Sequence, residues 1–182
     1  MTLTSNLRVE TFSFGLGTVV VKRGCVTNES VDAIVCPANS FNHMRGGAAG
    51  AIRKRGGDAI EETAQTMAPV AIGSAVITTG GLLLARYVIH APTMRMPVER
   101  SSAEAVVKAV RAALVCATQQ GFRSISFPGM GTGTGGVPYE LAATAMLREI
   151  REYLEHEPSE IGLVAYNDLL CAAFLCAARA KP

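Results

Sequence analysis

The pattern of apolar and polar positions divides the chain into short apolar runs and longer stretches in which apolar residues recur every three or four positions. The short runs, rich in Val and Ile, predict buried β-strands, and the longer spacing predicts helices with one buried face. Gly, Pro, Asn and Asp separate these segments. The expected strands are residues 8–14, 18–22, 31–36, 75–79, 87–91, 123–127 and 161–166, and helices are expected around residues 53–55, after Asp58, over 101–121 and 138–153, and from about Asp168 onward.

Local signals mark the ends of several expected segments. Ser101 and Glu104 have the spacing of a capping box, in which two side chains bond free N–H groups at a helix start. Gly121 provides the left-handed residue that ends many helices, and Pro92 is expected to end the strand that precedes it. Pro138 is favourable as the first residue of a helix.

Strands and helices alternate through most of the chain, a pattern typical of α/β proteins in which helices cover both faces of a largely parallel sheet. The first two strands are separated only by a short segment containing Gly15 and Gly17, which predicts a hairpin and an antiparallel edge. We therefore expect a three-layer αβα fold with a mixed, largely parallel sheet of six to seven strands. The length of 182 residues fits a single domain spanning residues 1–182.

Composition and charge narrow the function classes. The chain carries 17 Lys and Arg against 15 Asp and Glu, and a net charge of +2 is too small for a dedicated polyanion binder. The longest apolar run, residues 169–178, is too short to cross a membrane. The amino terminus lacks the pattern of a signal peptide, so a cytoplasmic protein is expected. Five cysteines without a CxxC motif indicate reduced, mostly buried thiols and no metal site.

The stretch FPGMGTGTGGVP at residues 127–138 has five glycines among residues 129–136 and lies between an expected strand and an expected helix. Glycine lets a ligand approach the backbone N–H groups without a Cβ in the way. A row of such groups at a helix start binds anions, most often phosphate. A flexible surface turn is the alternative interpretation. The spacing Gly131-x-Gly133-x-x-Gly136 also fits a dinucleotide fingerprint, although too few residues follow for a complete Rossmann domain.

A second glycine-rich stretch, residues 44–52, follows Asn39 and also leads into a helix. Because ligands of such folds bind outside the carboxyl ends of the strands, both glycine loops are expected to face one crevice. Two neighbouring anion sites suit a diphosphate, and Tyr166 after the last strand is placed to stack on a base. These features together indicate a nucleotide-like ligand that contains a pyrophosphate.

Five segments, in order, resemble the macrodomain family, whose members bind ADP-ribose. VDAIVCPANS at residues 31–40 is similar to the family's strand ending in Asn-Ala-Ala-Asn, and MRGGAAGAIRKRGG is similar to the glycine loop that follows it. YVIHAPTM, FPGMGTGTGGVP and LVAYND resemble the central strand, the second phosphate loop and the last strand. The resemblance covers about residues 19–178 and is strongest to prokaryotic stand-alone macrodomains.

The resemblance implies roles for individual residues. Asn39 would contact the distal ribose and help to place a water, which makes it the candidate catalytic residue. Tyr166 would pack against adenine, and residues 131–135 would wrap the diphosphate. No metal or other cofactor is implied. The implied ligand-binding residues are Cys25, Val26, Asn39, Arg45, Gly46, Gly47, Ala48, Gly129, Met130, Gly131, Thr132, Gly133, Thr134, Gly135, Tyr166 and Asn167.

Several departures from the family pattern bear on function. Cys25 stands where the family has an Asp that accepts a hydrogen bond from the adenine amino group. Binding is therefore expected to be weaker or less selective for adenine, unless another acceptor such as Asn167 takes its place. Ala49 stands where one hydrolase branch has a catalytic Asp, and Gly135 where an aromatic residue often covers the distal ribose. Arg45 replaces the first loop glycine, and its side chain either pairs with a phosphate or points to solvent.

The resemblance implies binding of ADP-ribose or of ADP-ribosylated protein, with no membrane partner. Hydrolysis of ADP-ribose from protein carboxylates, or from ADP-ribose 1″-phosphate, stays open, with the ligand's own α-phosphate as proton acceptor in place of the missing Asp. A reader without catalysis, and a module for nucleic acid or another nucleotide, are the alternatives. Nucleic acid is disfavoured because the chain has only ten Phe and Tyr, most of them in core-like positions.

Two further residues allow a chemical or a structural interpretation. Cys36, at a strand end, would be a nucleophile only if a base or cation lowered its pKa, and a small buried side chain is the simpler interpretation. His90 lies within an apolar strand, where a hydrogen-bonded core histidine is the default expectation.

Overall fold

A seven-stranded mixed sheet forms the centre of the computed structural model, which describes residues 9–157 and 159–180. The strand order is β1-β2-β7-β6-β3-β5-β4, with both edge strands antiparallel to their neighbours and the five inner strands parallel. This confirms the expected sheet and its hairpin edge. The strands are β1 Val9–Phe14, β2 Gly17–Arg23, β3 Ala33–Asn39, β4 Val76–Thr79, β5 Tyr87–Met94, β6 Ser124–Phe127 and β7 Glu160–Ala165.

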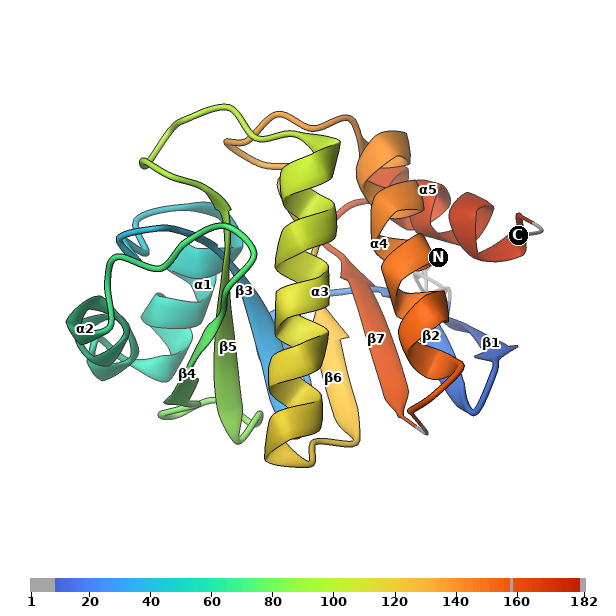
Figure 1. Ribbon diagram of the computed structural model, residues 1–182, viewed down its shortest axis with the longest axis horizontal. Coiled ribbons are helices and arrows are strands. Elements are labelled where there is room, and N and C mark those ends of the chain that lie inside the picture. The colour runs from blue at the N-terminus through green and yellow to red at the C-terminus, as the bar shows by residue number, and fades with distance from the viewer. Residues whose placement is uncertain (1–8, 158, 181–182) are drawn as a thin grey trace, which may run out of the picture.

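Helices cover both faces of the sheet, which confirms the three-layer αβα architecture. In Figure 1, α3 and α4 lie in front of the sheet and α1 lies behind it. Helix α5 packs with α3 and α4 in one apolar cluster, whereas α1 and α2 contribute to a second cluster. The helices are α1 Gly47–Gly56, α2 Ala59–Thr66, α3 Ala103–Gln120, α4 Tyr139–Leu154 and α5 Asp168–Arg179, and a short 3₁₀ helix, η1, spans Val26–Asn28.

The alternation of side chains along the strands divides the core between the two helix layers. On β3, Ala33 and Val35 face the layer of α3, α4 and α5, whereas Ile34 and Cys36 face α1 and α2. The core is mostly aliphatic, with Phe127 and Phe174 as its largest fully buried side chains. Both helix layers therefore anchor loops at the same edge of one rigid sheet.

Three expected segment ends are wrong by a small margin. Pro138 is the N-cap of α4 and not its first residue, which is Tyr139. The N-cap of α3 is Ser102, whose side chain accepts a hydrogen bond from Ala105 N at 3.1 Å, and Ser101 instead donates to the carbonyl of Thr93. Strand β5 does not end at Pro92, because it continues to Met94 along the carboxyl end of β3. Proline is tolerated there because the β3–β5 pairing is irregular beside it, with a register shift between Ala38 and Asn39.

Other sequence predictions about the chain have mixed outcomes. Gly121 ends α3 in the left-handed conformation, with φ of 69°, as expected. Only Cys36 and Cys171 are buried, while Cys176 is exposed, so the expectation of mostly buried thiols is wrong.

Within the described residues, no helix has the length and hydrophobicity needed to span a lipid bilayer. The same residues contain no group of three or more His, Cys, Asp or Glu side chains placed to hold a metal ion.

Candidate ligand-binding site

The loops that follow β3, β5 and β6 rise at one edge of the sheet, where the parallel strands end (Figure 1). The segment between β5 and α3 is hydrogen-bonded to the loop after β3 and to the loop after β6. Ser40 N donates to the carbonyl oxygens of Met94 at 3.1 Å and Arg95 at 3.0 Å, and Ser101 N donates to Gly135 O at 2.9 Å. Backbone hydrogen bonds therefore join the start of the β3–α1 loop and the β6–α4 loop to the same segment.

The β6–α4 loop needs its glycines because it packs closely against neighbouring atoms. Gly131 has φ of +70°, and a Cβ there would lie 2.8 Å from Val106 Cγ2. A Cβ on Gly135 would lie 2.6 Å from the carbonyl oxygen of Gly131. The loop is closed by a hydrogen bond from Val137 N to Gly131 O at 3.0 Å. These contacts make the loop a compact, internally bonded turn rather than a loose surface segment.

The same loop presents free backbone donors on its open side. Gly133 and Thr134 are exposed, and within the described residues their N–H groups donate to no backbone or side-chain acceptor. A Cβ on Gly133 would meet nothing within 4 Å. Successive free N–H groups beside the start of α4 form the kind of concave donor set that binds anions.

Asn39, the candidate catalytic residue, shapes the loop that follows β3. Its Oδ1 accepts hydrogen bonds from Phe41 N at 3.1 Å and His43 N at 3.3 Å, and its Nδ2 donates to His43 O at 2.9 Å. The residue is 7% exposed. The first role of this amide is therefore to order the loop, and its contact with a ribose stays a prediction.

The start of α1 supplies a second set of free donors. Gly46 is the N-cap and offers no side chain to the first turn, which contains no acidic residue. A Cβ on Gly46 or Gly47 would meet nothing within 4 Å, so the space beside both residues is open. Arg45 is exposed and forms no ion pair among the described residues. The helix dipole and this guanidinium both favour an anion here.

An aromatic and amide cluster lies at the end of β7. Tyr166 is 57% exposed, and its hydroxyl is hydrogen-bonded to that of Tyr139, the first residue of α4. The two rings meet edge to face with centroids 6.4 Å apart. The hydrogen bond to Tyr139 raises the pKa of Tyr166. Tyr166 therefore stands as an open, fixed aromatic face, in keeping with a partner for a base.

Cys25 reaches the same end of β7, because Gly24 N donates to Ala165 O at 2.8 Å. Its thiol lies 3.0 Å from Thr27 Oγ1. Asn167, the expected substitute acceptor, already caps α5, since its Oδ1 accepts from Leu170 N at 2.8 Å. Its Nδ2 donates to Tyr139 Oη at 3.1 Å. The substitution of the missing carboxylate by Asn167 therefore stays a prediction that relies on the second lone pair of one oxygen.

The family model described as "Macro domain" matches residues 35–146, which is more than half of the chain. The chain belongs to the macrodomain family. An uncharacterized protein of Aquifex aeolicus is 50% identical to this macrodomain over 135 residues, covering 74% of this chain and 82% of that protein.

Solved structures agree with this membership. A Trypanosoma brucei macrodomain in complex with ADP-ribose is 30% identical, with a TM-score of 0.78 over 86% of this chain and 67% of that one. An Oceanobacillus iheyensis macrodomain with ADP has a TM-score of 0.86 over 95% and 96% of the two chains. Its identity of 24% supports the fold alone.

Cys36 and His90 are structural residues of this macrodomain. They are register partners on β3 and β5, and both are completely buried. Burial raises the pKa of the Cys36 thiol to about 12 and lowers the pKa of His90 to about 4. His90 Nε2 is hydrogen-bonded to Thr78 Oγ1 at 2.9 Å. The structural interpretation of both residues is confirmed, because neither thiolate nor imidazolium forms readily in this environment.

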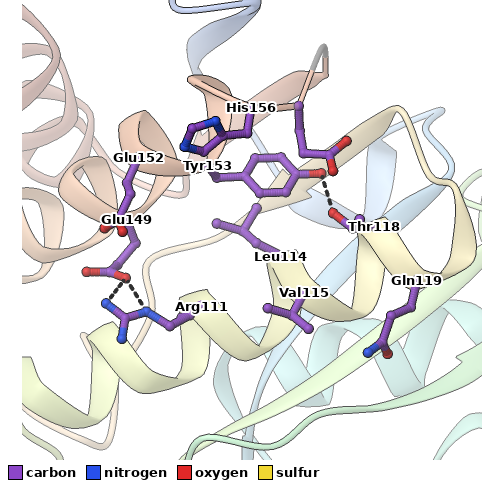
Figure 2. Close-up of a pocket in the computed structure, with 10 residues that line it drawn as sticks. Arg111, Leu114, Val115, Thr118, Gln119, Glu149, Glu152, Tyr153 and His156 are labelled. Atoms are coloured by element: carbon purple, nitrogen blue, oxygen red, sulfur yellow. Dashed lines mark hydrogen bonds and ion pairs between the residues drawn. The ribbon is translucent and has the colours of Figure 1, made fainter.

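A hollow of about 330 Å³ lies elsewhere, between the carboxyl-terminal halves of α3 and α4. Figure 2 shows Tyr153 of α4 beside Leu114 of α3, with the ion pair of Arg111 and Glu149 at one end. Both nitrogen contacts of that pair are 2.8 Å. None of the expected ligand-binding residues lines this hollow.

Sequence reasoning missed several residues that build the macrodomain's carboxyl edge. Ser101 bonds the β6–α4 loop through its N–H, and the hydroxyl of Tyr139 is hydrogen-bonded to that of Tyr166. The sequence signals at these residues were the capping-box spacing of Ser101 and the position of Tyr139 directly after Pro138, and neither signal indicates the contact that the residue makes. Met130 is completely buried, so only its backbone is available to a ligand.

Proposed function

We propose that this macrodomain binds ADP-ribose, free or attached to a protein, at the carboxyl edge of its sheet. The observation that carries the proposal is the pairing of two donor sets at one edge. One is the free N–H pair of Gly133 and Thr134, and the other is the uncapped start of α1. The Trypanosoma brucei macrodomain in complex with ADP-ribose, at 30% identity, supports the same assignment.

Each part of the ligand is assigned to a group of residues. The diphosphate lies on residues 131–135 and on the first turn of α1, where free N–H groups and Arg45 favour negative charge. Adenine packs against Tyr166, at the end of the edge where β2 and β7 finish. The distal ribose lies near Asn39, beside the segment that joins β5 to α3.

The side chains support binding more strongly than hydrolysis. The first turn of α1 contains no acidic residue, and Ala49 contributes only a methyl group. Asn39 uses both amide atoms within its own loop. A water attacking a carboxylate ester would therefore have to give its proton to a phosphate of the ligand. In that route Asn39 acts as a positioning residue through the loop that it orders.

Titration calorimetry with ADP-ribose, NAD and a short RNA tests the proposal, together with the variants Gly133→Ala and Gly133→Val. Wild-type protein should release or absorb heat with ADP-ribose. Because a Cβ at residue 133 meets no protein atom within 4 Å, both variants should keep the wild-type melting temperature. Affinity should fall modestly with Ala and at least tenfold with Val, since the added methyl groups occupy ligand space.

Three results would decide against the proposal. Absence of heat with millimolar ADP-ribose would exclude the site, and unchanged affinity in Gly133→Val would exclude the assigned phosphate loop. Heat with RNA alone would favour the nucleic-acid alternative. Incubation with a protein mono-ADP-ribosylated on Glu and with ADP-ribose 1″-phosphate separates a reader from a hydrolase, because a reader releases no free ADP-ribose above background.

A further inference from the structure

The turn at residues 95–100, between β5 and α3, exposes an unusual combination of side chains. Met96 is 54% exposed and Val98 is 82% exposed. Arg95 and Arg100 are also exposed, and neither forms an ion pair with any described carboxylate. Six residues thus expose two apolar side chains and two cationic ones, and the cationic ones have no ion-pair partner among the described residues.

The backbone of this turn is held in a strained conformation. Val98 has φ of +61°, a left-handed conformation that is a genuine outlier for a β-branched residue. The turn is closed by the Glu99 carboxylate, whose Oε2 accepts from Arg95 N at 3.0 Å and Met96 N at 2.9 Å. An exposed Val at a strained position adds little to the stability of the fold. Strain of this kind is typical of surfaces that contact a ligand or partner.

The turn is also fixed to the proposed ADP-ribose site at both of its ends. Before it, Ser40 N donates to the carbonyls of Met94 and Arg95, and after it, Ser101 N donates to Gly135 O. The Arg100 guanidinium lies directly against Gly136 of the phosphate loop. The turn therefore stands beside Asn39, the residue assigned to the distal ribose. It is joined to β5, and two strands, β3 and β6, lie between β5 and the strand β7 that leads to Tyr166.

We propose that residues 95–100 bind the acidic peptide to which the ADP-ribosyl group is attached. Arg95 and Arg100 pair with carboxylates that flank the modified residue, and Met96 and Val98 pack against an apolar side chain of the peptide. The proposal rests on the proposed function, because only an ADP-ribosyl group with its distal ribose near Asn39 directs the attached chain toward this turn. It names the substrate class as an ADP-ribosylated acidic peptide.

The composition of the turn favours a peptide over a nucleic acid. Single-stranded nucleic acids are bound by aromatic side chains on which bases stack, together with cations along the backbone. Residues 95–100 contain no aromatic side chain, and their exposed apolar groups are the aliphatic ones of Met96 and Val98. Aliphatic surface beside guanidinium groups matches a peptide with mixed acidic and apolar residues.

The first experiment compares wild-type protein with Arg95→Glu, and with Lys54→Glu as a control. Lys54 is an exposed cation near the end of α1, so the control makes the same charge change away from the turn. The ligands are free ADP-ribose, and a peptide carrying ADP-ribose through a non-hydrolysable link on a Glu position with Asp and Glu flanks. A matched conjugate with Asn and Gln flanks and an ADP-ribosylated oligonucleotide complete the set.

Wild-type protein should bind the acid-flanked conjugate about fivefold more tightly than the neutral one, as expected for two exposed ion pairs. Arg95→Glu should abolish this preference and leave the affinity for free ADP-ribose within twofold, and Lys54→Glu should keep the preference. Equal binding of both conjugates by wild-type protein, or an intact preference in Arg95→Glu, overturns the proposal. So does tighter binding of the oligonucleotide conjugate. Failure of free ADP-ribose to bind wild-type protein instead overturns the proposed function.

The variant Val98→Asn separates binding from stability. Asn adopts the left-handed conformation more readily than Val, so the melting temperature should rise by about 2–4 °C. Affinity for the acid-flanked conjugate should fall about threefold, because the apolar contact is lost. A purely structural role predicts that the more stable variant binds the conjugate at least as well as wild type, and that result would contradict the proposal.

Discussion

At the scale of single residues, the buried His90 shows how burial decides chemistry. Its Nε2 is bonded to Thr78, while its Nδ1 has no hydrogen-bond partner within the described residues. Its register partner Cys36 is completely buried, and this burial disfavours a thiolate and raises the pKa of the thiol to about 12. A Cys and a His side by side therefore form an inert pair of core residues, because both stay uncharged at neutral pH.

Because of His90, the stability of the protein should decrease as the pH falls into the mildly acidic range. Its pKa is lowered to about 4 in the folded chain from an ordinary value of 6.5. The unfolded chain therefore binds the proton first as pH falls below 6.5, so stability is complete above that pH and is lost toward pH 4. Between pH 7 and 5 the loss should be about 2 kcal/mol. Urea denaturation across this range measures it, and His90→Gln should remove this dependence. A wild-type stability that is constant from pH 7 to 5 would refute the assignment.

At the scale of elements, the β6–α4 loop separates glycines needed for packing from a glycine that leaves space for a ligand. Gly131 and Gly135 face protein atoms at less than 3 Å from an added Cβ, whereas Gly133 faces none within 4 Å. The same short loop thus contains two glycines required by close packing and one glycine beside open space. Substitutions at these positions should have different effects on stability and binding.

Gly135→Ala should destabilise the fold as well as weaken binding. The added Cβ would lie 2.6 Å from Gly131 O and 2.7 Å from Ser101 Cβ, so the loop and the β5–α3 segment must move apart. Overpacking of this kind costs about 1–3 kcal/mol in the free energy of unfolding. Urea denaturation and ADP-ribose titration measure the two effects, with Gly133→Ala as the matched control that affects binding only. Equal stability of the two variants would show that the loop is less tightly packed than described.

At the scale of the whole molecule, the two ends of the parallel strands have different roles. The amino ends carry contacts that stabilise the fold, and the carboxyl ends carry the proposed binding site. At the amino ends of β3 and β6, Asp32 Oδ2 accepts hydrogen bonds from Arg123 N at 2.9 Å, Ser124 N at 3.1 Å and Ser124 Oγ at 3.1 Å. These bonds, the one from Arg123 N foremost, lower the pKa of Asp32. The glycine loops lie at the opposite edge, where the same strands end.

Asp32→Ala should therefore lower stability without changing ligand affinity. Removal of the acceptor leaves two backbone N–H groups unpaired and should cost about 1–3 kcal/mol, whereas Asp32→Asn keeps one acceptor and should cost less. Because the pKa of Asp32 is lowered, its contribution is complete at neutral pH and is lost only as pH falls below the ordinary value of 3.8. Urea denaturation and calorimetry with ADP-ribose give the two readouts. A large loss of affinity in Asp32→Ala would contradict the separation of the edges.

The sequence predicted the order of elements and the two glycine loops, because both depend on local patterns such as VDAIVC and the glycines of residues 129–136. It did not predict the contacts that join distant segments. The bond from Ser101 N to Gly135 O and the pairing of Tyr139 with Tyr166 depend on how α3, α4 and β7 pack together. The N-cap at Ser102 in place of Ser101 has the same origin, since Ser101 is engaged by the carbonyl of Thr93.

The open space beside Gly46 and Gly133 allows the distance between each loop and a bound ligand to be measured by substitution. Neither residue has a left-handed backbone, and neither would bring a Cβ within 4 Å of another protein atom. A series of side chains of increasing volume at each position therefore changes the room left for a ligand while the fold stays the same. The side-chain volume at which ligand affinity is lost indicates the distance between the loop backbone and the bound molecule. Two such series, one from each loop, would locate the ligand between α1 and α4 by affinity measurements alone.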